Sequence, residues 1–359
     1  MHVPDGFIDA PTSAATGVLA AGALAVSLKG ARRELDERTA PLAGLVAAFI
    51  FAVQMLNFPV AAGTSGHLLG GALAAILVGP CTGVLCVSVV LLMQGILFAD
   101  GGLTALGVNI TDMAVVTTVV SYAVFRGLVK VLPRRRRSVT VASFVAALVS
   151  VPAAAVAFTL IYAVGGTTDV AISKVATAMI GVHVLIGIGE GTITALTVGA
   201  VIAVRPDLVY GARGLERKLK LRVNGQLVDA PDAEPAVPGA AALPQALDSA
   251  RAGRNPHHWK LWVTGLVTSL VLAGFVSFYA SASPDGLEKV AKDQGIARKT
   301  EPHASADSPL ADYGVRDIAD ARLSGGLAGV IGVGVTVVAG SAVFWAVRRR
   351  RTTEPSQAS

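Results

Sequence analysis

The first two residues of the chain, Met1 and His2, are of types that could bind a transition metal ion together. The terminal amine, the His2 amide nitrogen and the His2 ring nitrogen would close two unstrained chelate rings on one ion. Because the amide must lose its proton, the ion has to polarise it strongly, which favours Ni²⁺ or Cu²⁺ and permits Co²⁺. The alternative is that position 2 simply tolerates a histidine.

A third candidate ligand, His67, lies in the segment PVAAGTSGHLLGG. The small residues around it would allow another segment, such as the N-terminal loop, to approach closely, so that its ring completes a plane of four nitrogens. The alternative is a histidine that is hydrogen-bonded to the backbone. Three neighbouring polar residues could orient the imidazoles, although such groups more often join helices: Asn57, Thr64 and Ser65. The intramembrane polar residues Gln54, Gln94 and Asn109 carry the same two alternatives.

Two other patterns could have a function. His183 and Glu190 share one helix face in HVLIGIGEG, because they are seven residues apart. An ionisable pair in an apolar segment could be a proton relay, a second metal site or a contact with a partner helix, or else a buried structural pair. Gly17, Ala21 and Ala25 recur every four residues and form a face of small side chains. Such a face favours close helix packing, within the bundle or as a docking face for another subunit.

The composition indicates the elements that must position these residues. Of 359 residues, 53% are hydrophobic and 15% are charged, so the chain is expected to be an integral membrane protein. Short basic clusters separate long uncharged runs, which argues against nucleic acid as a partner and favours contacts of the arginines with lipid headgroups. No nucleotide-binding loop or hydrolase motif is present in the sequence, which predicts a protein that is not an enzyme.

A membrane-spanning helix needs about 20 apolar residues. The long apolar runs are residues 11–28, 40–99, 104–125, 138–168, 175–204, 261–284 and 323–347. If all basic clusters between them are cytoplasmic, the chain crosses an even number of times between successive clusters, so residues 67–98 should cross twice, with a break at Gly79-Pro80. This predicts an all-α fold: a seven-helix bundle, then a two-helix transmembrane hairpin with an extracytoplasmic loop. The N-terminus would be extracytoplasmic and the C-terminus cytoplasmic, in a multi-pass protein of the cell membrane.

The same interpretation of the sequence divides the chain into four parts. Residues 1–222 form the first membrane domain, and residues 223–256, rich in Ala, Pro and Gly, form a flexible cytoplasmic linker. Residues 257–351 form a second domain with two spans, and residues 352–359 form a disordered tail.

Several segments resemble the CbiM/NikM family, the substrate-binding membrane components of cobalt and nickel energy-coupling factor transporters. They are MHVPDGFID, AAFIFAVQMLNFPVAAGTSGHLLGGALAAILVGP, FADGGLTALGVNITDM and HVLIGIGEG. The segment SASPDGLEKVAKDQG resembles the PDGLE domain of the small accessory component with two spans. The chain is therefore similar to a fusion of these two components.

The resemblance implies a seven-helix bundle that binds Ni²⁺ or Co²⁺ as cargo, without a prosthetic group, through the Met1 amine, the His2 amide and ring, and the His67 ring. It implies a transmembrane coupling component and two cytoplasmic ATPases as partners of an ATP-driven importer. It does not separate nickel from cobalt, although the accessory domain favours nickel. The competing hypothesis is an autonomous permease that moves protons through His183 and Glu190. The acids of the accessory loop, Asp285, Glu288 and Asp293, could attract cations, hold the binding loop open or load the metal.

Overall fold

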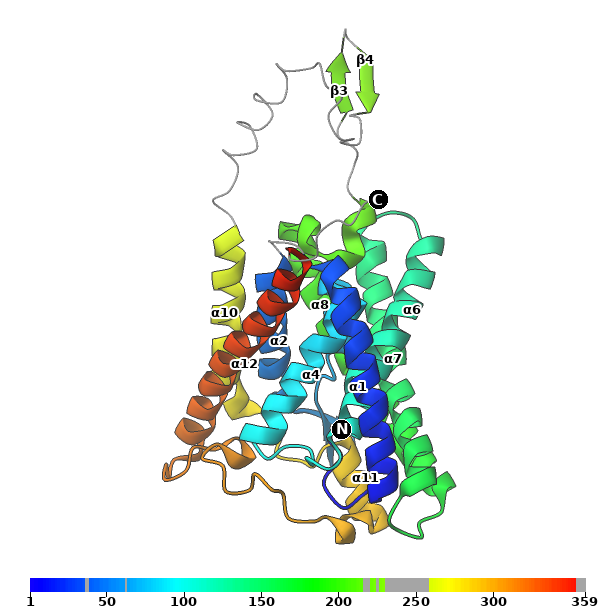
Figure 1. Ribbon diagram of the computed structural model, residues 1–359, viewed down its shortest axis with the longest axis vertical. Coiled ribbons are helices and arrows are strands. Elements are labelled where there is room, and N and C mark those ends of the chain that lie inside the picture. The colour runs from blue at the N-terminus through cyan, green and yellow to red at the C-terminus, as the bar shows by residue number, and fades with distance from the viewer. Residues whose placement is uncertain (36–38, 62, 216–219, 224–225, 230–257, 353–359) are drawn as a thin grey trace.

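The computed structural model describes residues 1–35, 39–61, 63–215, 220–223, 226–229 and 258–352, and these residues form a mostly helical protein (Figure 1). The N-terminal domain contains α1 (Ala10–Glu34), α2 (Thr39–Gln54), α3 (Gly71–Val78), α4 (Pro80–Leu97), α7 (Arg136–Gly165) and α8 (Ile172–Val204). Between α4 and α7, three helical segments follow each other without a break: α5 (Leu106–Asn109), the π-helix η1 (Ile110–Val116) and α6 (Thr117–Val131). These helices coincide with the apolar runs of the sequence, which confirms the predicted fold class.

Seven helices among the described residues are long and apolar enough to cross a membrane. They are α1, α4, the α5–α6 run, α7, α8 and, in the C-terminal part, the helices at 259–279 and 321–349. Two of the nine predicted spans are shorter, because α2 has 16 residues and α3 has only eight. The chain between α2 and α3 is a hairpin of β1 (Phe58–Ala61) and β2 (Thr64–Gly66) followed by the loop that carries His67.

Glycines determine where α3 begins and ends. Gly70 precedes it with a φ of +91° and Gly79 follows it with a φ of +104°, backbone conformations that side chains with a Cβ rarely adopt. At about 1.5 Å per residue, α3 rises about 12 Å. Its N-terminus therefore lies inside the bundle, and so does the loop before it.

The C-terminal domain packs against one side of the bundle. It consists of α10 (His258–Gly274), α11 (Gly286–Gln294) and α12 (Ala321–Thr352), and Figure 1 shows α10 and α12 beside α2. Gly44 of α2 faces Ser341 of α12, and Gly332 of α12 faces Phe51 of α2, so that glycines bring these two helices into close contact. α11 lies at the end of the molecule that also holds the N-terminus (Figure 1).

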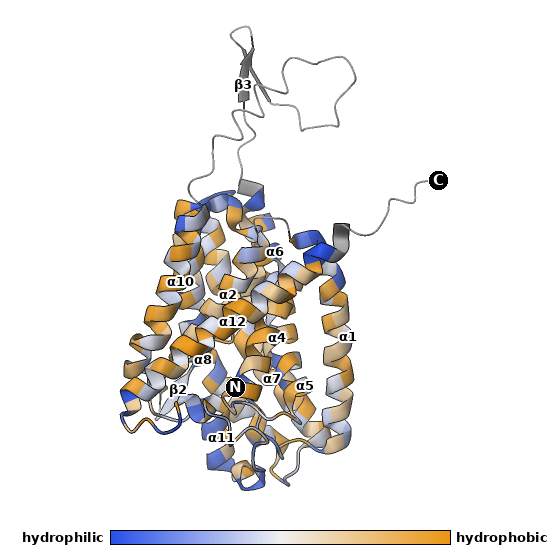
Figure 2. Cartoon of the chain, turned by 60° about the vertical axis from the view of Figure 1, so that its left-hand side comes forward, coloured by the Kyte–Doolittle hydropathy of each residue, from blue (hydrophilic) through white to orange (hydrophobic). Residues whose placement is uncertain are grey.

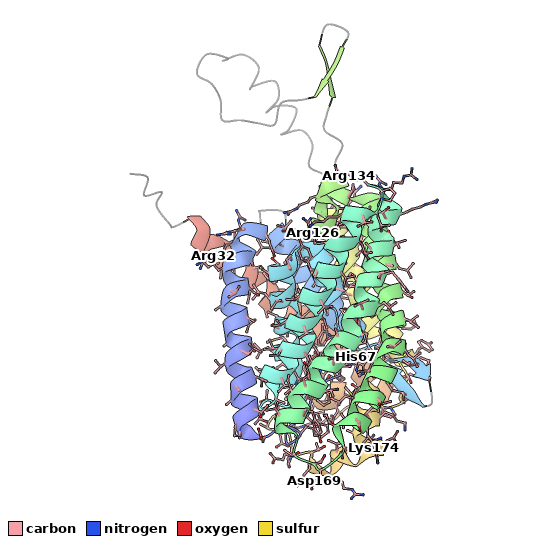
Figure 3. All side chains as sticks on the ribbon, turned by 90° about the vertical axis from the view of Figure 1, so that its right-hand side faces the viewer. Arg32, His67, Arg126, Arg134, Asp169 and Lys174 are labelled. Carbon is pink, nitrogen blue, oxygen red and sulfur yellow. The ribbon has the colours of Figure 1, made fainter. Side chains whose placement is uncertain are left out.

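Basic residues gather at the opposite end. Arg32, Arg126 and Arg134 lie there in Figure 3, whereas Asp169 and Lys174 lie at the other end. Figure 2 shows that the helix surfaces between the two ends are mainly hydrophobic, as a lipid environment requires. The chain is therefore a multi-pass membrane protein, and Arg32, Arg126 and Arg134, from its first two basic clusters, lie on one side as the even-crossing argument expects.

Part of the expected linker has regular structure. β3 (Lys220–Val223) pairs with β4 (Gln226–Asp229) in an antiparallel sheet, where a flexible segment was expected from residue 223 onward. The sequence signal that was missed is Asn224-Gly225 between the two strands, a dipeptide that favours tight hairpins. The remainder of the expected linker, from residue 230 to 256, lies outside the described residues, as does the expected tail from residue 353 onward.

Candidate metal centre

The N-terminal segment lies inside the bundle and is held there by hydrogen bonds. The side chain of Asn109 brackets Val3: its Oδ1 accepts the Val3 N–H at 2.7 Å, and its Nδ2 donates to the Val3 carbonyl at 3.1 Å. The N–H of Gly102 donates to the same carbonyl at 2.8 Å. Asp5 accepts from the backbone N–H and the hydroxyl of Thr104. These contacts fix the position of Met1 and His2.

The structure brings Met1, His2 and His67 together. His67 Nε2 lies 2.6 Å from the Met1 nitrogen, and the His2 and His67 rings meet edge to face with their centroids 5.2 Å apart. His67 Nδ1 lies 3.0 Å from the carbonyl oxygen of Leu68, which is an acceptor, so this nitrogen carries the proton. The lone pair of His67 Nε2 therefore faces the terminal amine.

Glu190 holds the loop that carries His67. Its carboxylate accepts the backbone N–H groups of Leu69 at 2.7 Å and of Gly70 at 3.1 Å. His183 instead faces its own helix, with Nδ1 2.7 Å from the Met179 carbonyl oxygen. Among the hydrogen bonds of the described residues, none joins His183 to Glu190. Seven residues of helix separate them by about 10 Å along the axis, so they share a face without touching.

Two of the residues expected to orient the imidazoles instead contact the C-terminal domain. The Ser65 N–H donates to the Pro284 carbonyl at 2.8 Å, and the Ser65 hydroxyl donates to the Ser283 carbonyl at 2.7 Å. The backbone carbonyl of Asn57 accepts a hydrogen bond from the Ser281 N–H at 2.7 Å. Thr64 is buried beside them in β2. The hairpin β1–β2 is therefore the docking site of the segment before α11.

Two carboxylates face the nitrogen atoms of the centre. Asp285 Oδ2, from the C-terminal domain, lies 2.7 Å from the Met1 nitrogen and 3.5 Å from His67 Nε2. Asp100 Oδ1 lies 3.0 Å from His2 Nδ1, and the Tyr313 hydroxyl donates to Asp100 Oδ2 at 2.6 Å. From the sequence we noted Asp285 only as one of three acids of its loop that could attract cations, hold the binding loop open or load the metal, and we did not single out Asp100 or Tyr313. Nothing in their spacing relates them to partners so far away in the sequence.

Both carboxylates are held ionised. Burial raises the pKa of Asp100, but the His2 ring and the hydrogen bonds from His2 and Tyr313 outweigh it and lower that pKa to about 2. Burial likewise opposes ionisation of Asp285, but the positive Met1 amine outweighs it and holds the pKa of Asp285 well below the usual range. The centre is therefore a place where two partly buried negative charges face a group of nitrogen donors.

A cavity of about 880 Å³ adjoins the centre, between the N-terminal segment, the loop after α4 and the C-terminal domain. Acidic residues outnumber basic ones in its lining, with Asp5, Asp100, Asp285, Glu288, Glu301 and Asp312 against Lys292 and Arg322. Such a lining attracts cations. A metal ion entering this cavity would reach His2 and His67, which also line it.

The small-residue face of α1 only partly coincides with its packing face. A Cβ at Gly107 of α5 would lie 2.5 Å from the Gly17 Cα, whereas a Cβ at Gly17 would meet nothing within 4 Å, so the close contact of α1 with α5 depends on Gly107. Ala21 and Ala25 are exposed, whereas α1 packs through Thr16, Ala20, Ser27 and Ala31. A docking role for this face stays a prediction.

Comparison with known proteins agrees with this geometry. The family model CbiM, described as the cobalt uptake substrate-specific transmembrane region, matches residues 2–208, more than half of the chain. The chain belongs to the CbiM family. A second model, the PDGLE domain, matches residues 259–349 of this CbiM-family protein.

Relatives cover the N-terminal part of the CbiM-family chain. A putative metal transport protein of Haloquadratum walsbyi is 39% identical over 210 residues, which are 58% of this chain and 94% of that protein. A putative fused nickel transport protein NikMN of Archaeoglobus fulgidus is 38% identical over 209 residues, 58% of this chain and 68% of that protein. The cobalt transport protein CbiM of Sorangium cellulosum is 34% identical over 217 residues, 58% of this chain and 94% of that protein.

A solved structure described as a transition metal transporter matches 57% of this chain and 93% of its own, with a TM-score of 0.51 and 28% identity. The protein is thus a cobalt or nickel transport membrane protein of the CbiM family with a fused PDGLE domain.

Proposed function

We propose that this chain is the metal-capturing component of an ATP-driven importer of the energy-coupling factor class, with Ni²⁺ or Co²⁺ as its cargo. The observation that carries the proposal is the meeting of the Met1 nitrogen and His67 Nε2, 2.6 Å apart, beside the His2 ring. These groups, with the His2 amide, are the donors of the expected chelate. They lie next to an acidic cavity through which a cation would arrive.

The residues around these donors fix the protonation of the His67 ring and the position of the main chain. The Leu68 carbonyl keeps the proton on His67 Nδ1 and leaves Nε2 free for a metal. Asn109 holds the main chain directly after His2. Binding would replace the protons of the amine and the amide by one divalent ion, a step that depends on pH.

Nickel is the better candidate for the cargo. Several relatives that are named fused nickel transport proteins, among them those of Archaeoglobus fulgidus and Rhodobacter capsulatus, share sequence with this chain. The chain also joins a CbiM region to a PDGLE domain. A nitrogen-rich site with a deprotonated amide suits Ni²⁺, which accepts a square-planar arrangement.

The proposed orientation places the N-terminus and α11 outside the cell and the basic end in the cytoplasm, following the positive-inside rule. A transmembrane coupling component and two ATPases would bind from the membrane and the cytoplasm, since the sequence has no nucleotide-binding loop of its own. The exposed small residues Ala21 and Ala25 on α1 remain the proposed docking face, with Gly17 at its edge.

The autonomous permease is the weaker alternative. In that hypothesis Glu190 and His183 pass protons, yet Glu190 is fully buried and its two oxygen atoms accept backbone N–H groups of the His67 loop. This arrangement favours a structural role for Glu190. Uptake that survives loss of the partner ATPases would support the permease instead.

The test is a metal titration of two purified versions of the full chain. One version has the native Met1–His2 terminus and the other has two residues added before Met1. Ni²⁺ and Co²⁺ are added to each, with calorimetry and visible absorption as readouts, and His67→Ala serves as a second variant. Tight binding by the native form alone is expected. Equal binding by the native and extended forms would contradict the terminal chelate.

A further inference from the structure

The two oxygen atoms of Asp285 have different partners. Its Oδ1 accepts the Glu288 N–H at 2.7 Å and so caps the N-terminus of α11. Its Oδ2 points the other way, 2.7 Å from the Met1 nitrogen and 3.5 Å from His67 Nε2. The second oxygen therefore lies against two of the proposed metal donors, although Asp285 belongs to the other domain.

The position of Asp285 is determined by the residues on both sides of it. Before it, the Pro284 carbonyl accepts the Ser65 N–H at 2.8 Å. After it, Gly286 lies so close to α8 that a Cβ would be 2.9 Å from the Ile186 side chain. Leu287 is only 1% exposed. The carboxylate is thus delivered to the centre by a docked and packed segment.

The distances among the three donor atoms are those of ligands that share one ion. The Met1 nitrogen, His67 Nε2 and Asp285 Oδ2 are separated by 2.6, 2.7 and 3.5 Å. Nitrogen and oxygen donors bind first-row ions at about 2.0–2.2 Å. A point about 2.1 Å from all three atoms exists outside their plane, so their spacing permits one ion to contact all three.

Charge balance also requires an acid here. A divalent ion bound to a deprotonated amide and neutral nitrogen donors carries a net positive charge. A buried charge without a counter-charge is costly. Without an ion, the negative charge of Asp285 balances the positive charge of the terminal ammonium. When an ion replaces the ammonium proton, the same carboxylate balances the charge of the ion.

We propose that Asp285 is an oxygen ligand of the captured ion, supplied to the Met1, His2 and His67 centre by the PDGLE domain. Without an ion, Asp285 Oδ2 contacts the Met1 ammonium; when the amine loses its proton and binds the ion, Oδ2 binds the ion as well. This inference rests on the proposed function, since it needs the terminal chelate. It also explains why the two domains are in contact at this point: part of the metal site lies in each of them.

The test compares Asp285→Asn with Asp293→Asn in the full-length protein. Asparagine retains the size and the N-cap of α11 but loses the charge. Asp293 is a matched control, because it lies on the exposed face of the same helix and pairs with Lys289. Titration with Ni²⁺ is expected to give an apparent Kd about 10- to 100-fold higher for Asp285→Asn and an unchanged Kd for Asp293→Asn. The visible absorption band of bound Ni²⁺ should shift only in Asp285→Asn, because a ligand changes the field at the metal.

An unchanged Kd and an unchanged absorption band in Asp285→Asn would overturn the inference. A lower Kd would overturn it as well, since the carboxylate would then compete with the ion. Asp285→Ser keeps the cap with a shorter side chain and replaces the asparagine variant if its thermal unfolding midpoint is much reduced. The extended N-terminus separates the two proposals: if extension abolishes binding and Asp285→Asn has no effect, only this inference fails.

Discussion

The carboxylate of Glu190 accepts the backbone N–H of Leu69 at 2.7 Å, which ties the middle of α8 to the loop that carries His67. The same carboxylate accepts the Gly70 N–H at 3.1 Å, at the start of α3. Glu190 thus holds the loop of the proposed ligand His67 in place, although the two residues are more than a hundred positions apart in the sequence.

Glu190→Gln is therefore expected to loosen this loop. A glutamine replaces one of the two acceptor oxygens by an NH₂ group, a donor that would face one of the backbone N–H groups. A hydrogen bond to a charged group contributes about 1.5–3 kcal/mol. We expect a lower thermal unfolding midpoint and weaker Ni²⁺ binding, measured by a thermal melt and by calorimetry. Asp169→Asn, in an exposed position, is the control and should change neither. Normal stability and binding, together with loss of proton-coupled uptake, would favour the permease.

Tyr313→Phe tests the support of His2. The Tyr313 hydroxyl donates to Asp100 at 2.6 Å, and Asp100 faces His2 Nδ1. Removal of the hydroxyl leaves Asp100, whose negative charge lies beside the chelating Nδ1 atom of His2, short of one hydrogen bond and less firmly placed. We therefore expect a rise in the Ni²⁺ Kd of about 10-fold, the lower end of the range for groups that surround a metal site.

Tyr279→Phe is the matched control for that variant, because Tyr279 is 73% exposed. Calorimetric titration of both proteins makes the comparison. Equal affinities would mean that Asp100 orients His2 without help from the C-terminal domain.

Gly332→Leu should separate α12 from α2. A side chain at Gly332 would collide with the Phe51 ring, whereas nothing lies within 4 Å of a Cβ at Gly334. With a protease site placed between residues 230 and 257 and cleaved, the two halves of the unchanged protein should co-purify in detergent. We expect the halves to separate in Gly332→Leu and to stay together in Gly334→Leu. Separation in both variants would mean that any leucine in this part of α12 disrupts the contact, and that the collision with Phe51 is not the cause.

Metal affinity should increase steeply with pH. The terminal ammonium and the His2 amide must each lose a proton to bind the ion, so two protons leave per ion. The Kd should then fall about 100-fold per pH unit. Calorimetry in buffers of different ionisation enthalpy counts the released protons. Release of a single proton would remove the amide from the ligand set.

The sequence by itself determined features of this protein that depend on neighbouring residues or on the composition of one segment. Met1 and His2 are covalent neighbours, so the two chelate rings that we propose follow from bond geometry alone. Most of the apolar runs form membrane helices, because a helix satisfies its own backbone hydrogen bonds in lipid. The positions of the basic clusters implied on which side each helix ends.

Only the tertiary structure decided which distant groups meet. Helical periodicity put His183 and Glu190 on one face, but the partner of Glu190 is the Leu69 N–H, which no periodicity identifies. Asp285 reaches Met1 across 284 positions of sequence. Asp100 and Tyr313 meet between two domains. Such contacts depend on how whole helices pack, and a hydrophobic pattern specifies which face is buried without specifying against what.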